Sequence, residues 1–385
     1  MEAERNPVLP DLLPPVAPAE KSAGVLPAQA IRALIGSGAL QAVPRIAEEQ
    51  IQPASIDLRL GARAWRLEAS FLPGPDATVE RRLEGLGPAP LDLSGGLVLE
   101  RGQVYLVELM ERLELPRHLS ASANPKSSTG RLDIFTRLIT DRGTAFDRVP
   151  RGYRGPLYAE IAPRTFSVRV RPGTRLNQLR FRRGSPIAAL PALSGLQERY
   201  GLVSGGGQPV IRENLVGLSL DLKGDESGLV GFVARKETGI LDLDQVGHYD
   251  PAEFWRPIHA RSGQGIVLTL DDFYILATKE AVSVPADYAA EMVAYDTQVG
   301  EFRVHYAGFF DPGFGVAEAG GAGSRAVLEV RSHEVPFILE HEQIVGWLRY
   351  ERLTARPDRL YGQGIGSNYQ AQGLKLGKHF RAWAG

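Results

Sequence analysis

Apolar residues recur at short spacing in many separate runs along the chain. GQVYLVELMERLEL (102–115) and FYILATKEAVSV (273–284) are rich in β-branched and aromatic residues, and glycines and prolines separate such runs. This pattern predicts strands. The clearest helix is predicted at 27–35 (PAQAIRALI), where Pro27 suits the first helical position and Gly36 follows the last periodic residue. We therefore predict a mostly β protein with a few short helices.

The same pattern occurs twice. YLVELMERLELP (105–116) recurs as YILATKEAVSVP (274–285) at an offset of 169, and SIDLR (55–59) recurs as SLDLK (219–223) at an offset of 164. A repeat of about 165 residues indicates a duplicated domain, because solenoid units are only ~20–50 residues long.

The duplication sets the expected domain organisation. A chain of 385 residues is too long for one ordinary core. We expect a disordered tail at 1–22, because this stretch is rich in proline and alanine and has no apolar period. After this tail we expect a first domain at 23–200, a glycine-rich linker at 201–208 and a second domain at 209–385.

Composition narrows the functional classes. The formal net charge is -1 and charged residues make up 23%, so we expect no nucleic-acid partner. The chain has neither an apolar run of the ~18 residues that a membrane span needs nor a secretory signal pattern. We expect a cytoplasmic protein with no membrane partner. It contains no cysteine, which excludes disulfides, thiolate zinc sites and thiol nucleophiles.

The polar run NPKSSTGR (124–131) is the first candidate for binding chemistry. Serine, asparagine and glycine also cluster in ordinary turns, so a plain turn is an open alternative. A turn of this composition can direct backbone N–H groups and two hydroxyls to one point, while Lys126 and Arg131 add positive charge for phosphates. We expect a surface loop that contributes little to the core.

An ordered set of motifs resembles the dCTP deaminases of the trimeric dUTPase superfamily. In the first half these are IQPASIDLRLG (51–61), PKSSTGRL (125–132), LYAEI (157–161) and RPGTRLNQL (171–179). In the second half they are HYAGFFDPGFG (305–315), AVLEV (326–330) and YGQGIGSNYQAQG (361–373). The resemblance implies two tandem β-barrel or jelly-roll-like domains in a homo-oligomer built around threefold axes. It also implies deoxycytidine nucleotide sites at domain interfaces.

The same resemblance implies the site residues. Nucleotide contacts are expected from Lys126, Ser127, Ser128, Arg131, Asp147, Gln178, Asp311, Tyr361, Tyr369 and Gln372. The C-terminal arm at 361–373 is expected to cover the triphosphate, so truncation after Leu360 should harm turnover more than folding. Its Asn368 departs from the family, in which a lysine is common. Mg²⁺ would arrive with the triphosphate, and no zinc or protein-bound metal is expected.

Deamination without zinc requires another way to activate water. Zinc-dependent cytidine deaminases use cysteine ligands, and this chain has none. A positioned carboxylate can instead activate water and protonate the pyrimidine ring nitrogen. By resemblance, the catalytic candidates are Glu160 in LYAEI or Glu329 in AVLEV, together with Ser127 and Arg131. Apolar surroundings would raise the pKa of either glutamate, although a glutamate in a strand can equally face solvent.

The two halves have lost different parts of the site. At the 169 offset, the phosphate loop is replaced in the second half by Tyr295, Asp296, Thr297 and Gly300. The first half lacks the arm. These complementary losses favour a composite site, in which the first-half loop meets Glu329, the arm and the expected hairpin HYAGFFDPGFG (305–315) of the second half. A ring of identical first domains would instead bring the loop to Glu160. We keep both glutamates, with a preference for Glu329.

Several activities fit this reading. The first is a hydrolase that converts dCTP to dUTP and ammonia. A dUTP pyrophosphatase or a bifunctional enzyme would use Asp311 or Asp147 to orient water beside Mg²⁺-bound phosphates. A catalytically silent nucleotide-binding regulator and a duplication in which one copy is a scaffold are further alternatives.

Overall fold

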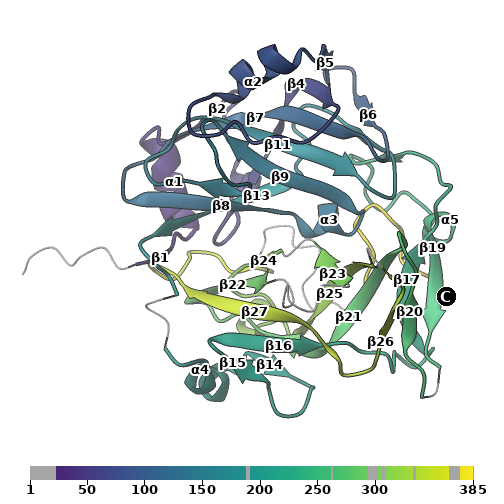
Figure 1. Ribbon diagram of the computed structural model, residues 1–385. Helices are drawn as coiled ribbons and strands as arrows, with labels where there is room; N and C mark the ends of the chain where they lie inside the picture. The colour runs from purple at the N-terminus through teal and green to yellow at the C-terminus, as the bar shows by residue number, and fades with distance from the viewer. Residues whose placement is uncertain are drawn as a thin grey trace, which may run out of the picture.

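The computed structural model describes residues 23–187, 191–261, 263–293, 302–305, 308–332, 335–363 and 373–384. The predicted tail at 1–22 and the predicted contacts Tyr369 and Gln372 lie outside these residues. Two β units follow each other along the chain and lie against one another (Figure 1). The mostly β prediction is confirmed.

The first unit consists mainly of two antiparallel sheets. The five-stranded sheet contains β1 (Gly24–Val25), β13 (Asn177–Arg183), β8 (Leu119–Pro125) and β10 (Arg148–Val149), with β3 (Ile56–Leu58) beside β13. The six-stranded sheet contains β5 (Pro90–Asp92), β4 (Leu60–Leu67), β7 (Val104–Glu114), β11 (Arg154–Pro163) and β9 (Ile134–Thr140), with β2 (Leu40–Ala42) beside β7. Apolar side chains of both sheets form one buried core.

The second unit repeats this arrangement. Its six-stranded sheet contains β19 (Trp255–His259), β17 (Leu229–Ala234), β21 (Phe273–Val282), β25 (Ser324–Ser332) and β23 (Phe302–His305), with β14 (Val203–Ser204) beside β21. Its five-stranded sheet contains β15 (Ile211–Arg212), β16 (Leu215–Ser219), β27 (Ile344–Arg352), β22 (Tyr288–Val293) and β24 (Phe309–Phe310). A further pair consists of β20 (Ile266–Leu268) and β26 (Phe337–Leu339).

The repeat extends to the pairing register. Glu160 on β11 lies opposite Leu106 on β7, and Glu329 on β25 lies opposite Ile275 on β21. Both pairs are related by the same offset of 169 that the sequence shows. The duplication is therefore a structural repeat of the central strands.

Helices are short in the described part of the chain. They are α1 (Ala28–Gly36), α2 (Val79–Leu86), α3 (Ser127–Gly130), α4 (Leu193–Tyr200) and α5 (Pro251–Phe254), with 3-10 turns η1 (Glu48–Gln50) and η2 (Ala317–Ala319). The predicted helix is α1, although Pro27 caps it in an extended conformation and is not its first residue.

The two units share buried apolar packing. Phe232, Trp255 and Phe380 belong to the core that is centred on the first unit. β12 (Val168–Val170) pairs with β6 (Leu97–Leu99) on one side and with β18 (Leu241–Asp242) of the second half on the other. The units therefore form one continuous structure.

Chain segments near the expected boundary pack with the second unit. Leu193 and Leu196 of α4 lie in the second core, and Val203 and Ser204 of the predicted linker form β14, which pairs with β21. The apolar side chains of this stretch are buried. It therefore packs against the second core and does not merely link the two units.

Candidate active site

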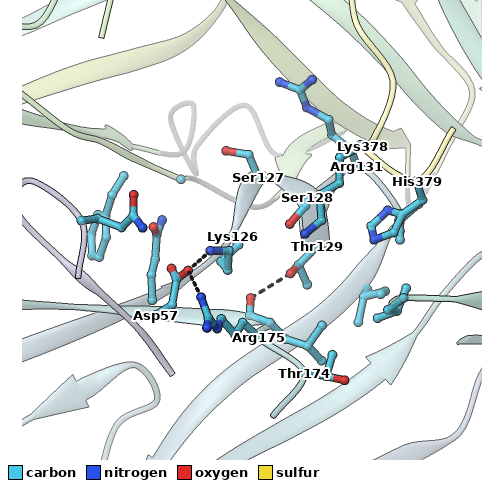
Figure 2. A pocket seen from close by; sticks show the side chains of 18 of the residues that line it. Asp57, Lys126, Ser127, Ser128, Thr129, Arg131, Thr174, Arg175, Lys378 and His379 are labelled. Atoms are coloured by element: carbon cyan, nitrogen blue, oxygen red, sulfur yellow. Dashed lines mark hydrogen bonds and ion pairs between the residues drawn. The ribbon is translucent and has the colours of Figure 1, made fainter. Parts of the chain in front are cut away.

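A cavity of about 540 Å³ opens between the two units (Figure 2). Its lining includes the α3 turn of the first unit, strands β24 and β25 of the second unit, and the C-terminal segment after the arm. Loop and glutamate thus come together within one chain, as in the composite arrangement.

The α3 turn is held in place by the chain just before β13. The backbone N–H of Lys126 and the hydroxyl of Thr129 both donate to the carbonyl of Leu176, each at 2.8 Å. Ser128, Thr129 and Arg131 are buried. The expectation of a surface loop that contributes little to the core is therefore wrong, because the second unit and the C-terminal segment cover the turn.

Asp57 is a cavity residue that the sequence analysis did not select. It lies on β3 in the repeated SIDLR motif, is 2% exposed and pairs with the ammonium of Lys126. Arg175 lies 4.0 Å from the same carboxylate oxygen. Figure 2 shows Asp57, Lys126 and Arg175 together on one side of the turn. The repeat of this aspartate as Asp221 was the available signal.

Glu329 lies on the cavity wall beside Arg131, the residue that ends the α3 turn. Its Oε1 is 3.9 Å from Nε of Arg131, and its side chain is 8% exposed. Burial raises the pKa of Glu329 to about 8, and the positive charge of Arg131 opposes this increase. Arg131 also donates from Nη1 to the carbonyl of Lys375 at 2.8 Å. A buried carboxyl group with a pKa near neutrality is suited to proton transfer.

Glu160 has the equivalent strand position but different surroundings. Its Oε1 accepts hydrogen bonds from Nε (3.0 Å) and Nη2 (2.6 Å) of Arg137, whose guanidinium stacks over Phe146 at 3.5 Å. Asp147, at a φ of 58°, accepts from the backbone N–H of Leu138 at 2.8 Å. Neither carboxylate is among the residues that line the cavity.

Asp311 and the start of the arm complete the cavity wall. Asp311 accepts hydrogen bonds from Arg180 Nη2 at 3.1 Å and from the hydroxyl of Ser55 at 3.2 Å. Burial raises the pKa of this carboxyl group, while the Arg180 charge and these hydrogen bonds act in the opposite direction. The ring of Phe314 contacts Tyr361 with centroids 5.7 Å apart.

Gln178 also lines the cavity, where its side chain donates to the carbonyl of Pro125 at 3.4 Å. Of the ten predicted nucleotide contacts, seven therefore line this cavity. They are Lys126, Ser127, Ser128, Arg131, Gln178, Asp311 and Tyr361.

Lys378 and His379 enter the cavity from the segment after the arm. Figure 2 shows both residues beside the α3 turn, with the label of Lys378 next to that of Arg131. His379 is 3% exposed, and burial lowers its pKa to about 4, so its ring is neutral near pH 7. Neither residue belongs to a motif quoted from the sequence above.

Metal binding and membrane spanning were considered for the described residues alone. No group of three or more His, Asp or Glu side chains in these ranges could hold a metal ion. No helix among them has the length and apolar character needed to cross a membrane.

Comparison with known protein families follows the same division of the chain. The N-terminal domain model of 2'-deoxycytidine 5'-triphosphate deaminase matches residues 22–185, and the C-terminal domain model matches residues 191–380. The chain belongs to the dCTP deaminase family. The resemblance noted in the ordered motifs is confirmed.

Individual relatives agree with this assignment. A dCTP deaminase of Natronomonas pharaonis is 34% identical over 136 residues, which is 35% of this chain and 67% of that protein. A dUMP-forming dCTP deaminase of Streptomyces avermitilis is 32% identical over 177 residues, or 44% of this chain and 84% of that protein. The crystal structure of 2'-deoxycytidine 5'-triphosphate deaminase from Agrobacterium tumefaciens is 53% identical. It matches with a TM-score of 0.82 over 87% of this chain and 99% of that one.

Proposed function

We propose that this protein hydrolyses the cytosine amino group of dCTP, giving dUTP and ammonia, in the cavity between its two units. One observation carries the proposal. Glu329 is a buried carboxyl group whose pKa is raised to about 8, and it lies 3.9 Å from Arg131 of the SSTGR turn. The family indicates the substrate class, and Glu329 with Arg131 provides the groups for proton transfer and charge stabilisation.

Glu329 acts in this proposal as the group that moves protons. Its carboxylate takes a proton from water, the resulting hydroxide adds to C4 of cytosine, and the carboxyl proton passes to N3. The tetrahedral intermediate then transfers the hydroxyl proton to the amino group. Ammonia leaves as the C4 carbonyl forms, and the net reaction is dCTP plus water to dUTP plus ammonia.

Other cavity residues bind and orient the nucleotide in this mechanism. Lys126, Ser127 and Ser128 present one ammonium and two hydroxyls to the phosphates. Asp311 holds the sugar, and Tyr361 begins the arm that covers the triphosphate. Arg131 stabilises the charge on Glu329 and on the intermediate. Mg²⁺ accompanies the triphosphate and neutralises part of its charge.

A bifunctional reaction that ends at dUMP is the second candidate, because the Streptomyces avermitilis relative is described as dUMP-forming. That reaction needs a carboxylate that is free to orient water toward phosphorus. Asp147 does not line the cavity, and Asp311 is assigned to the sugar in the scheme above. We therefore propose dUTP as the released product.

Product analysis with a matched pair of variants tests the proposal. We expect ammonia and dUTP in equal amounts from dCTP, without pyrophosphate, at a rate that zinc chelators leave unchanged. Glu329→Gln should lower kcat by about 10²–10⁴-fold, the usual contribution of general acid–base catalysis. Glu160→Gln, the same change at the equivalent position, should retain activity. Full activity in both variants, or loss in Glu160→Gln alone, would contradict the mechanism.

A further inference from the structure

Lys378 is a half-buried cation inside the cavity. Within the described ranges, its ammonium takes part in none of the side-chain hydrogen bonds or ion pairs. Burial lowers the pKa of Lys378, and so do the positive charges of Lys126 and Arg175. The negative charges of Asp57 and Asp244 act in the opposite direction. Holding a cation in such surroundings costs free energy unless an anion compensates for it.

The other lysine of the cavity has a different environment. Lys126 is paired with Asp57, and Arg131 lies beside Glu329. Asp57 therefore partly neutralises Lys126, and Arg131 is bound by a backbone carbonyl of the chain itself. Lys378 has no such ion pair among the described residues, so its ammonium is available to a ligand, and it stands close enough to Lys126 and Arg175 for their charges to affect it.

The backbone around Lys378 is held firmly. Its carbonyl accepts a hydrogen bond from the N–H of Gly247 at 2.9 Å, and the carbonyl of His379 accepts from the N–H of His248 at 2.9 Å. Phe380 is buried among Tyr249, Phe254 and Trp255. A side chain on such a fixed segment loses less freedom on binding than one on a free tail.

We propose that Lys378 binds the outer phosphates of the nucleotide and makes the cavity selective for a triphosphate over a monophosphate. The inference rests on the proposed function for the identity of the nucleotide. The phosphate contact itself requires only a polyphosphate. A lysine acts here as a compact point charge with three donors, which suits a chain of phosphates that also binds Mg²⁺.

Binding of inorganic triphosphate tests the contact without requiring turnover. We expect Lys378→Met to weaken its Kd, measured by isothermal titration calorimetry, by at least about tenfold, as for loss of one charge-assisted contact. Lys378→Arg should retain most of the affinity. Lys223→Met is the control, because Lys223 is an exposed lysine away from the cavity lining. An unchanged Kd in Lys378→Met would overturn the proposal, whether or not dCTP is deaminated.

Selectivity is tested with the nucleotides. In Lys378→Met the KM for dCTP should rise at least about tenfold with little change in kcat, while the inhibition constant of dCMP stays as in the wild type. An equal loss for dCTP and dCMP would show a structural role and overturn the proposal. Because the variant removes a half-buried cation, its thermal midpoint should not fall. Lys378→Gln gives a second, polar substitution for the same measurements.

Discussion

Glu329 and Glu160 occupy the same position of the repeat, and their neighbours separate them. Glu160 is bound by the guanidinium of Arg137 through two hydrogen bonds. Glu329 has the Arg131 charge at 3.9 Å and lines the cavity. The two copies of one ancestral glutamate therefore have different environments. The repeat alone could not show which copy lines the cavity.

The pKa of Glu329 predicts a pH-dependent stability difference. Its pKa is about 8 when folded and near the usual 4.5 when unfolded, so between these values only the folded state keeps the proton. Stability contributed by this group is present below about pH 4.5 and is lost as pH rises toward 8. Glu329→Gln removes this loss, so the stability of the variant relative to the wild type should grow by about 1.4 kcal/mol per pH unit across this window.

Thermal melts between pH 5 and pH 9 measure this difference. The exposed Glu226→Gln variant is a control for the loss of one formal charge. A Glu329→Gln advantage that does not vary with pH would contradict the predicted ionisation.

At the scale of elements, the α3 turn joins binding residues to a buried anchor. Ser127 is half-buried and lines the cavity, whereas Arg131 is 2% exposed and bonded to the carbonyl of Lys375. A turn of only four residues owes its shape to such contacts with the rest of the chain.

Alanine substitutions in this turn should separate the two roles. Ser127→Ala should reduce kcat/KM at least about tenfold with little change in the thermal midpoint, because one hydroxyl on a half-buried turn contributes little to stability. Arg131→Ala should reduce both kcat/KM and the thermal midpoint, because it also removes a buried hydrogen-bonded group. Steady-state kinetics and thermal melts on both variants check this. A Ser127→Ala protein that melts early but retains full activity would contradict the assignment.

The C-terminal segment is a second element whose role the fold changes. Leu376 and Phe380 are buried in the core shared by the units, so truncation after Leu360 removes core side chains. We now expect this truncation to lower the thermal midpoint strongly, since loss of one buried Phe side chain alone costs about 3–5 kcal/mol. The earlier expectation that turnover would suffer more than folding does not follow from this packing. Phe380→Ala alone should lower the thermal midpoint for the same reason, and Arg381→Ala, at a 56% exposed side chain, is its matched surface control.

At the scale of the whole molecule, the two halves build one cavity from complementary parts. The SSTGR turn comes from the first unit, and Glu329 and Asp311 come from the second unit of the same chain. Arg180 of β13 links the units near this cavity, because it donates to the carbonyl of Ala290 on β22 and to Asp311. Homo-oligomer assembly around threefold axes stays a prediction.

A mixing experiment tests whether one chain is sufficient. Arg131→Ala and Glu329→Gln chains, co-expressed and purified together, should have no more activity than the separate variants, because each chain carries one defect in its own cavity. Wild-type and Glu329→Gln chains co-expressed in the same way give the reference for mixed samples. Recovery of activity in the doubly defective mixture would show that the sites are shared between chains.

Local patterns and motif order were enough to predict the β character, the duplication, the family and several of the cavity residues. The choice between Glu160 and Glu329 depends on Arg137 and Arg131, which lie far from their glutamates in sequence. The tertiary structure also decided the burial of the α3 turn and the positions of Asp57 and Lys378. Burial and pKa values are properties of contacts between distant segments, so they exist only once the two units have packed together.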